Sequence, residues 1–258
     1  MRLYLLPLVY LLLLPFAMAA QGYRSSLDDF YLAEGIDGGK FFKRLSIAVG
    51  KQYIPGEIKF QFNGFVDTVF RDIKQEDNLK SKESYAVHVG SYFPITLVSD
   101  NSMLVLNIEL YASVTKLSYD SIAITARKNI MIPYETYRAG MPVSIEYRIG
   151  GDVLLNKSSK TIIGIGGGLC PQIIKSDDYN KQIPILITPF IKGELGFFAG
   201  LAFKVRAMYY WGTYHYGITE EYGLFDTPNN YTKAEFNGAS GFSISLVAMP
   251  FSFLWNKN

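Results

Sequence analysis

The stretch from Leu195 to Trp211 constrains the fold of this chain more than any other. Its side chains alternate with a period of two, which indicates a β-strand, because successive side chains point to opposite faces of the pleat. The odd positions are apolar and end in Tyr209 and Trp211, whereas the even positions include Lys204 and Arg206. A soluble core would not take two unpaired charges. We therefore predict a hairpin near residue 192 and then one long strand, with its apolar face toward lipid and its charged face toward a barrel interior.

The first 20 residues are typical of a secretory signal peptide. Arg2 precedes an apolar segment that ends in small residues, and cleavage is expected after Ala19 or Ala20. Residues 21–40 show no sustained period and are expected to form a periplasmic leader, and residues 41–258 are expected to form the barrel domain. The formal charge of +2, of which Arg2 contributes one, gives no indication of a nucleic-acid partner.

The remaining sequence favours a closed barrel over any other way of crossing a membrane. After the signal peptide no apolar run reaches the roughly 18 residues that a spanning helix needs. A sheet in lipid must close on itself, because open edges would leave backbone groups without hydrogen bonds. Cys170 is the single cysteine, so no disulfide within the chain can support the fold. The alternative fold is a soluble lipocalin-like barrel, which would place the apolar faces and a ligand inside.

The alternation predicts an all-β, closed, antiparallel up-and-down barrel of eight strands. The strands are expected at residues 41–53, 85–94, 103–116, 138–149, 161–174, 183–191, 195–211 and 236–253. Short links alternate with long loops, as in outer-membrane barrels with both termini in the periplasm. Residues 54–83 are expected to be a long outer loop that begins as a hairpin. If residues 57–66 span the membrane instead, the barrel has ten strands.

In these features the chain resembles the small outer-membrane barrels of Gram-negative bacteria, the OmpA-like and OmpX-like proteins. The resemblance covers the mature chain and consists of the signal peptide, the strand alternation, the loop asymmetry and the aromatic ending. It implies a place in the outer membrane, contact with outer-membrane lipid and insertion by the barrel assembly machinery, which in this family recognises a terminal aromatic residue. Phe251, Phe253 and Trp255 supply such residues, although Asn256, Lys257 and Asn258 follow them.

The inward faces of the predicted strands carry charges of both signs. An eight-stranded barrel has an interior about wide enough for its own side chains, so these charges are expected to pair. The predicted charge network consists of Arg44, Glu109, Glu146, Arg148, Lys204 and Arg206, with His88, Asn107 and Lys192 as lesser members. The favoured interpretation is a rigid, salt-bridged lumen. The alternative is a polar constriction that selects a small solute.

The sequence favours a role without catalysis. A lipid-modifying enzyme needs a nucleophile, a base and an acid in contact, and the only histidines are His88 and His215. Two histidines also make a zinc site improbable on ligand count, so no catalytic residue, metal or cofactor is expected. The sequence GIGGGL at 164–169 lacks the helix that a dinucleotide site requires. Its glycines are expected to keep a narrow lumen free of bulk or to let the sheet bend.

The aromatic segment that follows the long strand suggests a surface for binding. Residues 209–231 are expected to form an outer loop whose aromatic side chains could anchor an extracellular ligand or protein. The residues proposed for that surface are Tyr210, Trp211, Tyr214, His215 and Tyr216.

Overall fold

The computed structural model describes residues 42–66, 69–99, 101–119, 135–153, 155, 160–176, 185–212, 214–220, 231–238 and 240–255. The predicted signal peptide and leader lie outside these residues, as do most of the expected outer segments at 120–134, 177–184 and 221–230. Within the described part of the chain, no helix is long and apolar enough to cross a membrane.

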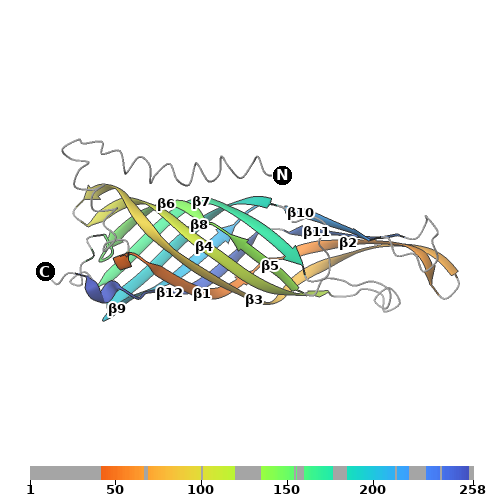
Figure 1. Ribbon diagram of the computed structural model, residues 1–258, viewed down its shortest axis with the longest axis horizontal. Coiled ribbons are helices and arrows are strands. Elements are labelled where there is room, and N and C mark those ends of the chain that lie inside the picture. The colour runs from red at the N-terminus through yellow and green to blue at the C-terminus, as the bar shows by residue number, and fades with distance from the viewer. Residues whose placement is uncertain are drawn as a thin grey trace.

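The described residues form one antiparallel sheet in which eight strand positions close into a ring, as the sequence predicts (Figure 1). The ring runs β1–β3–β4–(β5, β6)–β7–β8–β9–β12 and returns to β1. β5 and β6 share one position, because both pair with β4 and β7 and are separated only by Met141 and Pro142. The strands are β1 (Ser46–Tyr53), β3 (Val69–Ser99), β4 (Ser102–Tyr119), β5 (Glu135–Gly140), β6 (Val143–Gly150), β7 (Thr161–Ser176), β8 (Ile185–Ala199), β9 (Leu201–Tyr210) and β12 (Gly241–Met249).

A second group of strands extends the sheet beyond one mouth of the ring. β2 (Gly56–Val66) forms a long hairpin with the first part of β3, and β11 (Tyr231–Gly238) and β10 (Tyr214–Glu220) add to β2. This four-stranded extension projects from the end of the barrel opposite the turn between β8 and β9 (Figure 1). Residues 57–66 therefore do not span the barrel wall, and the ten-strand alternative is wrong.

The two faces of the barrel wall are oriented as the alternation predicts. Val205 is 54% exposed, whereas its neighbours Lys204 and Arg206 are 2% and 1% exposed. The same holds in β12, where Phe242, Ile244 and Leu246 are exposed and the intervening serines are buried. The lipocalin-like alternative is wrong, because the apolar faces lie outside and the charges lie inside.

The largest differences from the expected strands concern 195–211 and 236–253. The predicted strand 195–211 is in fact two strands, with the turn at Gly200, whose φ of +79° favours glycine. Residues 236–253 are likewise not one strand, because residues 236–238 belong to β11 in the extension, and β12 ends at Met249. A short 3₁₀ helix, η1 (Ser252–Leu254), then begins to close the other mouth.

The exterior changes character within β3. In the ring the odd positions Tyr85, Val87 and Val89 are exposed, and in the extension the charged side chains at 72, 74 and 76 are exposed, as are Val69 and Phe70 at its tip. A register shift between Ser81 and Glu83 separates the two parts. Because an extra residue in one strand reverses the parity of its faces, the charged even positions of the extension follow the apolar odd positions of the ring. The extension therefore suits water, whereas the ring below it suits hydrocarbon.

Candidate functional site

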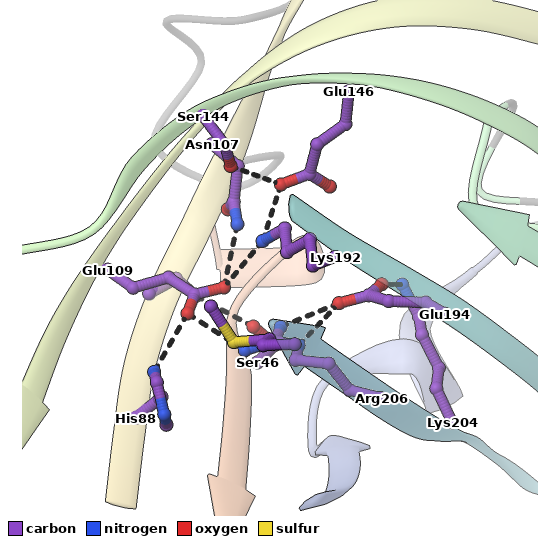
Figure 2. A network of polar contacts seen from close by, with 12 residues as sticks. Ser46, His88, Asn107, Glu109, Ser144, Glu146, Lys192, Glu194, Lys204 and Arg206 are labelled. Atoms are coloured by element: carbon purple, nitrogen blue, oxygen red, sulfur yellow. Dashed lines mark hydrogen bonds and ion pairs between the residues drawn. The ribbon is translucent and has the colours of Figure 1, made fainter. Parts of the chain in front are cut away.

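The centre of the barrel holds a network of four acids and four bases, all buried. Figure 2 shows Glu109, Glu146, Lys192, Glu194, Lys204 and Arg206 of this network. Glu109 comes from β4, Glu146 and Arg148 from β6, Lys192 and Glu194 from β8, and Lys204 and Arg206 from β9. Asp152 comes from the turn after β6. Each residue points inward because it occupies an alternate position of a strand whose other face is apolar, except Asp152, whose turn folds back into the barrel.

Six of these residues form a closed ring in which charges alternate in sign. Around the ring, the nitrogen–oxygen distances are 3.2 Å for Lys192–Glu109, 2.5 Å for Lys192–Glu146, 2.6 Å for Arg148–Glu146, 3.4 Å for Arg148–Glu194, 2.7 Å for Arg206–Glu194 and 2.8 Å for Arg206–Glu109. Every member therefore contacts two opposite charges. Because each ion has more than one partner, the attraction between opposite charges offsets the free-energy cost of removing the ion from water.

A second, smaller ring shares the Arg148–Glu194 contact with the first. Asp152 lies 2.7 Å from Arg148 and 2.8 Å from Lys204, and Lys204 lies 3.1 Å from Glu194. Four negative and four positive side chains are thus joined in two fused rings with no net charge. Glu194 and Arg148 belong to both rings, so each contacts three opposite charges.

Neutral polar groups also contact the carboxylates of the network. The Asn107 amide donates to Glu109 at 2.6 Å, and the Ser144 hydroxyl donates to Glu146 at 2.7 Å. His88 Nδ1 lies 3.2 Å from Glu109 Oε2, although the contact lacks hydrogen-bond geometry, and the imidazole packs against Tyr111 at 4.9 Å between ring centroids. These groups hold the carboxylates in fixed orientations.

The glycines of β7 explain how side chains of β6 and β8 can meet inside the barrel. Gly166 pairs with Glu146 on one side and with Lys192 on the other, and Gly164 stands in the same way between Arg148 and Glu194. Since these positions carry no side chain, residues two strands apart can meet above them. A Cβ on Gly166 would lie 2.4 Å from the Ile145 carbonyl oxygen and 2.5 Å from Glu146 Cγ. The GIGGGL segment therefore makes room for the ion pairs and has no helix after it.

Replacing Gly166 with alanine should destabilise the barrel by roughly 1–3 kcal/mol, the usual cost of overpacking. The matched control is Gly193→Ala in β8, where a Cβ would meet nothing within 4 Å. Unfolding in urea, followed by the gel mobility of heated and unheated samples, measures both variants. Equal stability of the two variants would contradict this account of the glycine.

The lower part of the interior is sealed by apolar side chains. Tyr92 donates to the Asp152 carbonyl at 2.6 Å, and its ring lies 4.2 Å from the Arg148 guanidinium and 5.7 Å from that of Arg44. Beneath it Val153 and Leu155 from the turn after β6 pack with Trp255, whose indole donates to the Lys43 carbonyl at 3.0 Å. Val153, Leu155, Trp255 and Tyr92 thus form an apolar plug below the charge network.

The structure places all six residues of the predicted charge network in the interior. Five of them join the fused rings, and Lys192 joins as well, whereas Arg44 lies beside Tyr92. Sequence reasoning missed Glu194 and Asp152. Glu194 has the same parity as Lys192 and Gly196, which could have identified it, but the hairpin was expected near residue 192. Asp152 lies between the strands expected at 138–149 and 161–174, and no periodic signal marks a turn that folds inward.

The predicted loop surface is divided by the structure. Tyr210 faces inward, packing against Phe190 with 6.0 Å between ring centroids, whereas Trp211 is 39% exposed on the exterior next to Tyr209. The backbones of Tyr214, His215 and Tyr216 belong to β10, at the edge of the extension. Tyr210 and Trp211 therefore do not share one binding face, and the segment 209–231, expected as a loop, contains the strand β10.

A closed sheet with an apolar exterior and a charged interior paired on itself suits lipid and not water. The fold is that of a small transmembrane β-barrel. Aromatic side chains flank the apolar band, with Tyr53, Tyr85, Tyr209 and Phe242 toward the extension and Phe42, Phe251 and Phe253 toward the other mouth.

Comparison with known proteins gives likenesses of shape. No family model and no curated protein matches the chain. The barrel is similar to outer membrane protein OprG from Pseudomonas aeruginosa, with 9% identity over 79% of this chain and 94% of that one and a TM-score of 0.43. It is also similar to outer membrane protease OmpT from Escherichia coli, with 6% identity over 78% and 96% and a TM-score of 0.38. For Ail, the attachment invasion locus protein of Yersinia pestis, the identity is 8% over 75% and 98%, with a TM-score of 0.27.

Proposed function

We propose that this protein is a non-conducting outer-membrane scaffold that holds the four-stranded extension at the cell surface for binding. The observation that carries the proposal is that the two fused ion-pair rings and the apolar plug below them occupy the lumen. A pathway for water or solute would have to separate charges that each contact at least two partners. Such a separation leaves buried charges uncompensated.

The orientation follows from the two mouths of the barrel. At the mouth nearest η1 the chain reverses within a few residues, between Ser99 and Ser102 and at Gly200, whereas the opposite mouth carries the extension. Long connections belong to the outer side of bacterial barrels. We therefore place the extension outside the cell and both termini in the periplasm, with the signal peptide as the export signal. Contact with lipid and insertion by the assembly machinery are part of the same proposal.

A scaffold that binds a partner needs no catalytic group, and the interior residues have structural contacts instead. His88 lies inside the barrel, 1% exposed and next to Glu109. We keep the prediction that the protein is not an enzyme. Loss of a lipid-modifying activity on replacing His215 with alanine would contradict it.

Replacing Glu146 with alanine is expected to destabilise the barrel without opening a channel. The change leaves Lys192 with Glu109 and leaves Arg148 with Glu194 and Asp152, so the rest of the network still blocks the lumen. Single-channel recording in planar bilayers measures the conductance, and urea unfolding measures the stability. Wild-type protein without steady conductance, together with a silent Glu146→Ala variant, would support the scaffold. A sharp rise in conductance in the variant would favour a gated small-solute channel instead.

A further inference from the structure

A belt of polar side chains crosses the exterior of the barrel wall at the end that carries the extension. It spans five neighbouring strands, β1, β3, β4, β5 and β7, and its members occupy the outward-facing positions of these strands. Three lysines and two glutamates give the belt a net charge of +1. In ring order this outer belt consists of Lys51, Tyr85, Glu83, Lys116, Glu135, Tyr137 and Lys175.

The centre of the outer belt is neutralised by its own members. Lys116 Nζ lies 3.5 Å from Glu83 Oε2 on one side and 3.9 Å from Glu135 Oε1 on the other. The Tyr137 hydroxyl donates to Glu135 Oε2 at 2.7 Å. Both glutamates of the belt therefore contact the central lysine, and its positive charge is compensated within the wall.

At each end of the outer belt a lysine lies next to a tyrosine of the neighbouring strand. Lys51 pairs with Tyr85 across β1 and β3, with its Nζ 5.9 Å from the centre of the tyrosine ring, and Lys175 pairs with Tyr137 across β7 and β5. Both lysines are exposed. Neither forms an ion pair with a carboxylate among the described residues. The two end charges are therefore available to an anionic group outside the chain.

The outer belt lies where the apolar exterior of the ring ends. Lys51 stands two residues before Tyr53, the last residue of β1, and Val49 on its other side is exposed and apolar. Lys175 likewise follows the exposed Ile173 and precedes the last residue of β7. A lysine on the lipid face costs little free energy near the interface, because its stem lies along apolar surface while its ammonium group reaches the headgroups.

The positive charge is confined to one side of the barrel. On β8, β9 and β12, the described outward positions at the same end carry apolar or aromatic side chains and no charge. These exposed residues are Ile185, Ile187, Tyr209 and Phe242. An anionic headgroup is therefore attracted to the side formed by β1, β3, β4, β5 and β7, whereas the opposite side offers only apolar and aromatic contacts.

We propose that the outer belt binds the phosphate groups of anionic lipids in the outer leaflet, with Lys51 and Lys175 as its two points of contact. An ammonium group is a compact point charge that suits phosphate, and a lipid places its phosphate at the level where the apolar band stops. The inference rests on the proposed orientation of the barrel and deepens it, because it names the lipid group and the side of the barrel that holds it. It requires neither a closed lumen nor a partner at the extension.

The probe is phosphatidic acid, added to the full-length barrel in detergent and measured by native mass spectrometry, with phosphatidylcholine of the same acyl chains as the zwitterionic analogue. We expect phosphatidic acid to be retained more strongly, by about fivefold for each of the two lysines. Lys51→Gln or Lys175→Gln should each lose one such factor, and the double variant should lose the preference. The matched control is Lys59→Gln with Lys74→Gln, which removes two exposed lysines from the extension.

A second pair of substitutions separates charge from folding. Lys51→Arg with Lys175→Arg keeps both positive charges and should keep the preference for phosphatidic acid. The proposal is overturned if the wild type shows no preference, if the folded double glutamine variant keeps it, if the control loses it, or if excess inorganic phosphate displaces the lipid, which would indicate a site for the free ion.

Folding into phosphatidylcholine vesicles, followed by the gel mobility of unheated samples, is measured for every variant. A barrel that inserts into vesicles but does not distinguish the two headgroups overturns this inference alone. A wild-type chain that does not insert overturns the proposed function as well.

Discussion

Replacing Glu194 with alanine is expected to destabilise the barrel by roughly 3–5 kcal/mol, the cost of removing one partner from a buried ion pair. Glu194 is the carboxylate that joins the two rings, with contacts of 2.7 Å to Arg206, 3.1 Å to Lys204 and 3.4 Å to Arg148. Its loss leaves three buried cations with one contact fewer each. Urea unfolding in detergent or lipid vesicles, followed by gel mobility, measures the effect.

The matched control is Glu76→Ala in the extension. Glu76 pairs with Lys59 at 3.0 Å, but the two side chains are 72% and 45% exposed. Solvent screens such a pair, and its contribution is expected to be about 0–1 kcal/mol. If Glu194→Ala and Glu76→Ala proved equally mild, the fused rings would not be what stabilises the interior.

Replacing Val205 with arginine should destabilise the membrane-inserted barrel by roughly 2–4 kcal/mol, the effect of an arginine on the lipid face near the bilayer midplane. Val205 is 54% exposed and lies between Leu195 and Leu246, which are also exposed. Its side chain is therefore expected to contact the hydrocarbon of the bilayer. Folding into lipid vesicles and unfolding in urea measure the change.

The control is the replacement of Asp72 with arginine, on the exposed charged face of the extension. This change should alter the free energy of unfolding by no more than about 0.5 kcal/mol. The contrast follows from the change in exterior at the register shift in β3. A Val205→Arg variant as stable as the wild type in vesicles would show that this face of β9 does not meet lipid.

The hairpin predicted near residue 192 lies at Gly200, and the difference has a physical cause. Across the turn at Gly200, Phe197 pairs with Phe203 and Leu195 pairs with Val205, so every paired position joins two odd or two even residue numbers. The alternation therefore continues through the turn without a break and resembles that of one long strand. Only the pairing of the two strands shows where the chain reverses.

In β3 the alternation does break, and for this reason the sequence did not predict the full length of the extension. The register shift in β3 exchanges the exposed parity between Ser81 and Glu83, so the alternation on the two sides of it is out of phase. The sequence predicted a hairpin at the start of residues 54–83, and the structure extends it to Val66 and Val69. That β11 and β10 join the same sheet depends on pairing between segments more than 150 residues apart, for which alternation gives no signal.

Alternation with a period of two is a local property, because it depends only on which neighbouring side chains share a face. It was sufficient to predict a β-barrel, its eight strands, its apolar exterior and the inward direction of Glu109, Glu146, Lys204 and Arg206. Which charges meet is a property of the closed ring, since strand pairing places Gly164 and Gly166 between residues of β6 and β8. Only the tertiary structure could therefore decide that Glu194 joins two rings and that Asp152 folds inward.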